Sequence, residues 1–118
     1  MTIEIKKNAA EVTIEVAGRL DTITAPVLEG TINENIVDAA SLVLNFDGLE
    51  YISSAGLRVL LGAQKKMNQI GTMKLTNVRE EVMDVLEMTG FADIDKPDFY
   101  VSDIKRLHIR FSERGDRT

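Results

Sequence analysis

Hydrophobic and polar positions alternate at the start of the chain. Ile3 and Ile5 alternate with charged residues, and Val12, Ile14 and Val16 alternate with polar ones after a short polar stretch. A period of two is typical of a strand with one buried face. Two such runs joined by a short turn predict a β-hairpin.

The next stretch, GRLDTITAP, predicts a loop that leads into a first helix. Thr24 is a candidate helix cap, and Pro26 suits the first helical turn, where its missing N–H does no harm. Leu28, Ile32 and Ile36 recur every fourth residue, which is the spacing of a core-facing helical stripe.

Strand-like and helical patterns then alternate. SLVLNF is almost continuously apolar, as expected of a central parallel strand covered on both faces. The loop DGLEYIS leads to a predicted helix over residues 54–70, TMKLTN predicts a strand, and VREEVMDVLEMTG predicts a helix ended by Gly90. DFYVSD is a candidate edge strand, and residues 101–118 are a last helix or a flexible tail. This order predicts βαβ crossovers and one α/β domain over residues 1–100.

The predicted helix over residues 54–70 has a polar face and an apolar face. Its apolar side is predicted to enter the core and comprises Leu57, Leu60, Leu61, Met67 and Ile70. The other side is polar or small and comprises Ser54, Arg58, Gly62, Lys65 and Gln69. Glycine costs a helix about 1 kcal/mol relative to alanine. A closely packed partner, a crowded internal contact or chance could each explain Gly62.

Composition narrows the class of function. A formal net charge of −5 over 118 residues argues against nucleic acid as a partner. The chain has no cysteine, which excludes disulfides and thiolate chemistry and fits a reducing cytoplasm. No signal peptide or membrane-spanning segment is expected, so the predicted location is cytoplasmic.

Two adjacent serines, Ser53 and Ser54, follow the central strand at the start of the predicted helix. They could cap the helix, act as a nucleophile or accept a phosphate. A nucleophile needs a general base, and the single histidine, His108, has no neighbouring carboxylate in the sequence RLHIR. We also find no G-x-S-x-G elbow, no phosphate loop and no metal-ligand spacing. The sequence therefore predicts a protein that is not an enzyme and needs neither cofactor nor metal.

Three segments in order, VAGRLDTITAP, LVLNFDGLEYISSAGLRVLLGAQKKM and MKLTNVREEVMDVLEMTGFADI, resemble the STAS domain, specifically the stand-alone bacterial anti-sigma factor antagonists. The resemblance covers roughly residues 1–95. It implies a small mixed β-sheet of four or five strands with helices packed mainly on one face. It also implies partner switching: the unmodified antagonist binds an anti-sigma factor that is a serine protein kinase, phosphorylation releases it, and a serine phosphatase resets it.

The family motif Asp-Ser-(Ser/Thr)-Gly-Leu, aligned on Gly56 and Leu57, implies that Ser54 is the phosphate acceptor. Ser53 stands in place of the family aspartate and is the second choice. The predicted partner-binding residues are Asp21, Thr22, Ser53, Ser54, Arg58, Gly62 and Lys65. The protein is expected to regulate sigma-factor-dependent transcription as a monomer or weak dimer. The alternative is a STAS domain that acts as an interaction module in another signalling or lipid-transport complex without phosphorylation.

Overall fold

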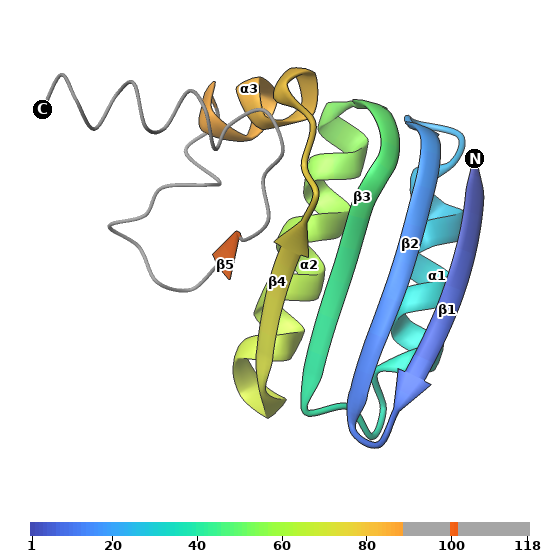
Figure 1. The fold of residues 1–118 in the computed structure, drawn as a ribbon, viewed down its shortest axis with the longest axis vertical. Coiled ribbons are helices and arrows are strands. Elements are labelled where there is room, and N and C mark those ends of the chain that lie inside the picture. The colour runs from blue at the N-terminus through green and yellow to red at the C-terminus, as the bar shows by residue number, and fades with distance from the viewer. Residues whose placement is uncertain (89–99, 102–118) are drawn as a thin grey trace, which may run out of the picture.

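A five-stranded sheet in sequence order runs through the computed structural model, which describes residues 1–88 and 100–101 (Figure 1). The first two strands pair antiparallel, and every later pair is parallel. The strands are β1 (Thr2–Asn8), β2 (Glu11–Leu20), β3 (Ser41–Ile52), β4 (Thr72–Thr76) and β5 (Tyr100–Val101). The predicted mixed sheet is confirmed, and so are the hairpin at its start and the short strand within DFYVSD.

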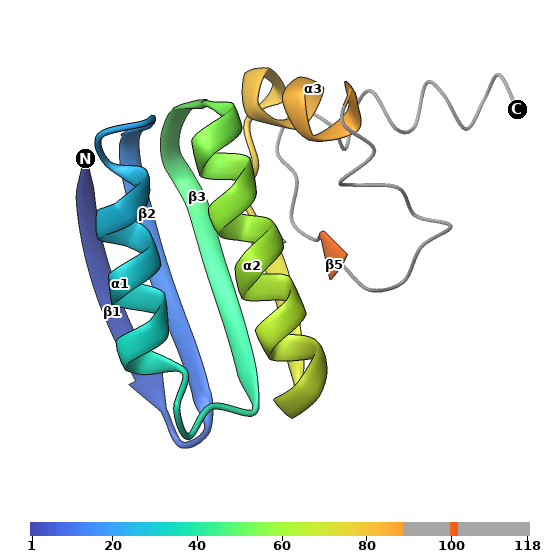
Figure 2. The same cartoon turned by 180° about the vertical axis from the view of Figure 1, so that it is seen from behind.

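Helices pack against one face of this sheet. The helices are α1 (Ala25–Asn35), α2 (Ser54–Ile70) and α3 (Glu80–Met88). Figure 2 shows α1 and α2 lying side by side over the strands, while α3 lies at one end of the sheet. The other face, turned to the viewer in Figure 1, carries no helix among the described residues. The prediction of helices mainly on one face is therefore confirmed.

The core lies between the sheet and this helical layer. Its largest side chain is Phe46 of β3, which is fully buried together with Leu42 and Leu44. Val43, which faces the other way on the same strand, is also buried, as the apolar sequence of this strand predicts. The predicted stripe is buried, since Leu28 and Ile32 of α1 and Ile36 just after its end are all in the core.

The strands β2 and β3 are longer than predicted. We expected loops from Gly18 and from Asp47 onward, but β2 and β3 stay paired up to Leu20 and Ile52. The register shifts twice along this extension. A β-carbon on Gly48 would lie 2.7 Å from the β-carbon of Ala17, so glycine allows the close approach of the two strands here.

The orientation of α2 also differs in part from the prediction. Leu61 and Ile70 were expected in the core, but they are 43% and 47% exposed. The buried stripe passes instead through Gly56, Val59, Leu60, Ala63, Gln64 and Met67. Leu61 lies outside this stripe, and Ile70 is the last residue of the helix, so neither reaches the sheet.

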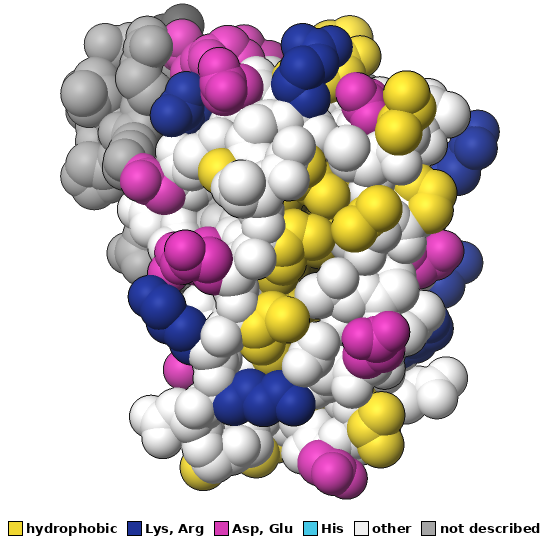
Figure 3. All heavy atoms as spheres, turned by 90° about the vertical axis from the view of Figure 1, so that its right-hand side faces the viewer, with side chains coloured by type: hydrophobic (Ala, Val, Ile, Leu, Met, Phe, Trp, Pro, Cys, Tyr) yellow, Lys and Arg dark blue, Asp and Glu magenta, His cyan; other side chains and the backbone are white. Residues whose placement is uncertain are grey.

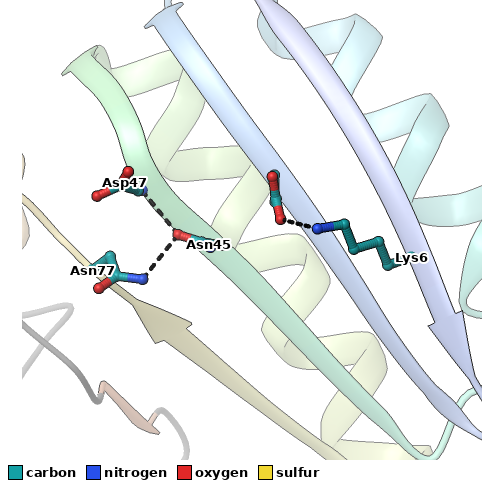
Figure 4. Close-up of polar contacts among 5 residues, drawn as sticks. Lys6, Asn45, Asp47 and Asn77 are labelled. Carbon is teal, nitrogen blue, oxygen red and sulfur yellow. Dashed lines mark hydrogen bonds and ion pairs between the residues drawn. The ribbon is translucent and has the colours of Figure 1, made fainter.

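Polar contacts tie the strands together on the face without helices (Figure 4). The Asn45 side-chain oxygen accepts hydrogen bonds from the Asp47 backbone N–H at 3.0 Å and from the Asn77 amide at 3.2 Å. Nearer the edge, Lys6 forms a 2.8 Å salt bridge with Glu15. These contacts link β3 to the end of β4 and β1 to β2.

Within the described residues, no helix combines the length and apolar character needed to cross a bilayer. The predicted helix terminator Gly90, the histidine His108 and all of the predicted tail except Val101 lie outside the described residues.

Candidate functional site

The two serines lie where the central parallel strand ends and α2 begins. The Ser53 backbone N–H donates a 2.9 Å hydrogen bond to the carbonyl oxygen of Leu20, the last residue of β2. This bond joins the start of α2 to the loop over residues 21–24. The carboxyl ends of β2 and β3 therefore bring the two predicted parts of the site together, at the edge where ligands of open α/β sheets usually bind.

Ser53 is the helix cap, a role that the sequence had left open to either serine. Its backbone is extended, and its hydroxyl oxygen accepts a 3.3 Å hydrogen bond from the Gly56 backbone N–H. Its carbonyl oxygen accepts a 2.9 Å bond from the Leu57 N–H. Capping therefore occupies Ser53 and leaves Ser54 outside the cap.

Ser54 is the first residue of α2 and is exposed. The first turn of α2 contains no acidic residue, so no like charge opposes an anion there. The N–H groups at a helix start and the helix dipole favour negative charge. A phosphate on Ser54 would thus be electrostatically compatible with the folded helix.

The outer face of α2 joins Ser54 to the predicted partner-binding residues Arg58 and Lys65, which are also exposed, and to the half-buried Gly62. A β-carbon on Gly62 would meet no atom within 4 Å. A crowded internal contact is therefore excluded as the reason for this glycine. The helix carries Arg58, Lys65 and Lys66 and no acidic residue, so its surface is basic on a chain of net charge −5.

Gly56, one residue beyond Ala55 in the serine motif, has a packing role. A β-carbon there would lie 2.8 Å from both Ile52 Cγ1 and Leu20 Cγ. Only a residue without a side chain lets α2 start so close to the ends of β2 and β3. The glycine of the motif thus positions the serines.

The loop before α1 is organised by Asp21. Its carboxylate accepts hydrogen bonds of 3.0 Å from the backbone N–H groups of Ile23 and Thr24. The bond from Thr24 N–H is the main cause that lowers the pKa of Asp21 from its usual 3.8. Thr24 stands at the cap position of α1, but its hydroxyl donates to the Arg19 carbonyl at 2.8 Å instead of capping the helix. Thr24 therefore occupies the predicted cap position, but the prediction that its side chain caps α1 is wrong.

Among the predicted loop residues, Thr22 is exposed and Asp21 is half-buried. Two exposed apolar side chains in this part of the structure were not among the predicted site residues. Ile23 is 83% exposed in the loop, and Leu61 is 43% exposed two turns along α2 from Ser54. The sequence did hold an indication that Leu61 is exposed. Leu61 follows Ser54 by seven residues, and this spacing places both on the same side of a helix.

The described residues hold no cluster of three or more His, Asp or Glu side chains able to bind a metal ion. The geometry of the serine region is that of an exposed surface: a hydroxyl, a basic helix face and two apolar side chains.

Comparisons with known proteins show the family of the chain. Residues 2–103 match the STAS domain family. The chain is 30% identical over 95 residues to the anti-sigma-B factor antagonist of Bacillus subtilis, covering 80% of this chain and 87% of that protein.

Its fold is similar to that of the anti-sigma factor antagonist SpoIIAA in the unphosphorylated form, with a TM-score of 0.74, 19% identity and 97% of each chain covered. The phosphorylated form of SpoIIAA from Bacillus gives a TM-score of 0.67 at 18% identity, covering 93% of this chain and 99% of that one. The chain belongs to the STAS domain family, and its relatives include anti-sigma factor antagonists.

Proposed function

We propose that this protein is an anti-sigma factor antagonist that is switched off by phosphorylation of Ser54. The observation that carries the proposal is the division of roles between the two serines. Ser53 holds the start of α2 through its bond to Gly56, while Ser54 is exposed beside it. The 30% identical relative in Bacillus subtilis is named as an anti-sigma-B factor antagonist.

In this proposal the unmodified protein binds an anti-sigma factor of the serine protein kinase type. The docking surface is the outer face of α2 together with the adjoining loop over residues 21–24. Binding releases the sigma factor for transcription. The kinase then phosphorylates Ser54, the complex separates, and a serine phosphatase restores the hydroxyl. The protein itself catalyses no step, requires no cofactor and acts in the cytoplasm.

The charge of α2 supports a role for phosphate at this position. The three cations of the helix give it a formal charge of +3. A phosphate adds about −1.5 to −2 charges, so roughly half to two-thirds of this charge would be cancelled. A partner surface that is shaped for a neutral hydroxyl and complementary to a basic helix would also have to desolvate the new charge. A loss of about 10²–10³ in affinity corresponds to roughly 3–4 kcal/mol and is reasonable for one such group.

Apolar side chains supply the other part of the docking surface. Ile23 in the loop before α1 and Leu61 on α2 are exposed, and exposed apolar groups of this kind are typical anchors of protein interfaces. Asp21 supports Ile23 because its carboxylate fixes the loop. We propose that Asp21 acts mainly by positioning the loop, whereas Thr22 and Ile23 contact the partner.

The decisive experiment incubates the protein with its cognate kinase and ATP and locates the phosphate by mass spectrometry. We expect phosphate on Ser54 in the wild type and in Ser53→Ala, and none in Ser54→Ala. In a binding assay Ser54→Asp should weaken the complex, whereas Ser54→Ala should retain it. Phosphate on Ser53, or on neither serine, would refute the assignment. Partner binding without any phosphorylation would favour a STAS interaction module of another complex.

A further inference from the structure

The outer edge of β1 is open among the described residues. β1 pairs with β2 on one side, and no described strand lies on its other side (Figure 1). An edge strand of this kind presents unpaired backbone N–H and C=O groups that can accept a further strand. The edge also exposes apolar side chains, since Ile5 is 43% and Met1 37% exposed.

The neighbouring side of α1 continues this apolar surface. Asn33 accepts a hydrogen bond from Lys66 of α2, so the side of α1 that carries Asn33 faces α2. Val27, six residues earlier, points about a third of a turn away from Asn33 around α1 and is 57% exposed. Figure 3 views the molecule from this edge and shows hydrophobic side chains gathered in a strip over β1 and α1.

The charged side chains of β1, Glu4 and Lys6, restrict which strands can pair with its open edge. Glu4 lies directly opposite Glu15 of β2, and like charges in this arrangement repel. Glu15 is already bound to Lys6 at 2.8 Å. Charged side chains on an edge strand oppose pairing with most other strands. Such side chains allow pairing with a strand that places a side chain of opposite charge across from each of them.

We propose that β1 is the interface for a second copy of this chain. The two β1 strands pair antiparallel and are centred on Ile5, so that Ile5 lies opposite Ile5 of the second copy. In this register Glu4 lies opposite Lys6 of the second copy, and the same pair recurs through the two-fold axis. The sheets of the two copies join into one, and the exposed Ile5 side chains of the two edge strands are covered.

The pairing is self-complementary only in this arrangement. Centring the strands on Glu4 or on Lys6 would place two identical charges opposite each other. The chain as a whole carries a net charge of −5, and two copies therefore repel at long range. We expect a weak dimer that forms at high protein concentration and in moderate salt, where this repulsion is screened.

This interface is separate from the proposed phosphorylation site. The strand β2 and helix α1 stand between β1 and α2, and the outer face of α2 with Ser54 stays exposed in the dimer (Figures 1 and 2). The inference therefore does not depend on the proposed function. A dimer would present two Ser54 side chains, one on each copy.

The test measures mass in solution by sedimentation velocity over a range of concentrations. We expect the wild type to approach twice its 13.1 kDa as concentration rises. Glu4→Lys and Lys6→Glu should each remain monomeric, because each places like charges opposite each other in the register. An equimolar mixture of the two variants should form a heterodimer, because lysines at positions 4 and 6 then meet glutamates at both.

Lys65→Glu is the matched control, since it reverses one charge on α2 and should leave the dimer unchanged. Thermal melting followed by circular dichroism shows whether each variant is folded. Formation of the heterodimer in the mixture is independent evidence that Glu4→Lys and Lys6→Glu are both folded. A wild type that stays monomeric at all concentrations would overturn the proposal. So would dimers that persist in both single variants, or folded variants that fail to pair when mixed.

Discussion

Two glycines of α2 provide a test of how this helix packs against the sheet. Gly56 and Gly62 lie in the same helix, and the same change to alanine adds one methyl group at each. At Gly56 the new carbon would lie 2.8 Å from Ile52 and Leu20 side-chain carbons, whereas at Gly62 it would meet nothing within 4 Å. The two substitutions should therefore have opposite effects on stability.

The magnitudes follow from packing and from helix propensity. Overpacking a close core contact costs about 1–3 kcal/mol, because α2 or the ends of β2 and β3 must shift. In the open space at Gly62, alanine lacks that cost and gains about 1 kcal/mol over glycine in a helix interior. The free energies of unfolding of the two variants should therefore differ by at least about 2 kcal/mol.

Urea denaturation followed by far-UV circular dichroism measures both values. Equal effects of the two substitutions, or a destabilised Gly62→Ala, would refute the proposed seating of α2. The same variant also tests the docking surface. If a partner packs closely over Gly62, then Gly62→Ala should weaken the complex even though it stabilises the free protein.

Four other substitutions, one of them measured through its pH dependence, test the remaining structure. Ser53→Ala should lower the free energy of unfolding by about 1 kcal/mol, because the cap is lost. Ser54→Ala should change this free energy by less than about 0.5 kcal/mol. Urea denaturation measures both values, and equal losses would contradict the division of roles between the two serines. Phe46→Ala should cost about 3–5 kcal/mol, and a smaller loss would show that Phe46 is not a central core residue. The lowered pKa of Asp21 means that its carboxylate stabilises the fold above the unfolded-state value near 3.8 and that this contribution is lost as pH falls through the folded-state pKa. Asp21→Ala should therefore flatten the acid limb of a plot of melting temperature against pH, and an unchanged slope would count against the loop contacts.

Periodicity in the sequence predicted much of the fold. The alternation of Ile3, Ile5, Val12, Ile14 and Val16 corresponds to β1 and β2, and the predicted helix over residues 54–70 has the bounds of α2. The position of the two serines at the start of the predicted helix indicated a cap as well. In the structure the hydroxyl of Ser53 accepts a hydrogen bond from the Gly56 backbone N–H. These features depend on local spacing, which a sequence displays directly.

The features that the sequence did not predict depend on neighbours distant in the chain. The segment after Phe46 contains Asp47, Gly48 and Glu50 and reads as a loop, yet it pairs with the equally extended β2. Thr24 looked like a cap because nothing in its spacing shows that Arg19 and Asp21 use its hydroxyl. Leu61 was assigned to the core because its side chain is apolar, while the contact at Gly56 sets which face of α2 meets the sheet.

The partner-binding roles of Asp21, Thr22, Ser53, Ser54, Arg58, Gly62 and Lys65 stay predictions. Exposure and contacts define what these side chains can reach, but a docking surface is specified by the partner as well as by the chain. The kinase and binding assays described above test them directly.

The separation of the cap from the exposed serine has a consequence for the lifetime of the protein. Proteolysis of a small domain follows the population of its unfolded form. Since Ser53 and not Ser54 holds the start of α2, a phosphate on Ser54 should leave that population nearly unchanged. Both forms should then be degraded at the same rate, and the ratio between them would be set by the kinase and the phosphatase alone. Limited proteolysis of the two forms side by side would measure this equality.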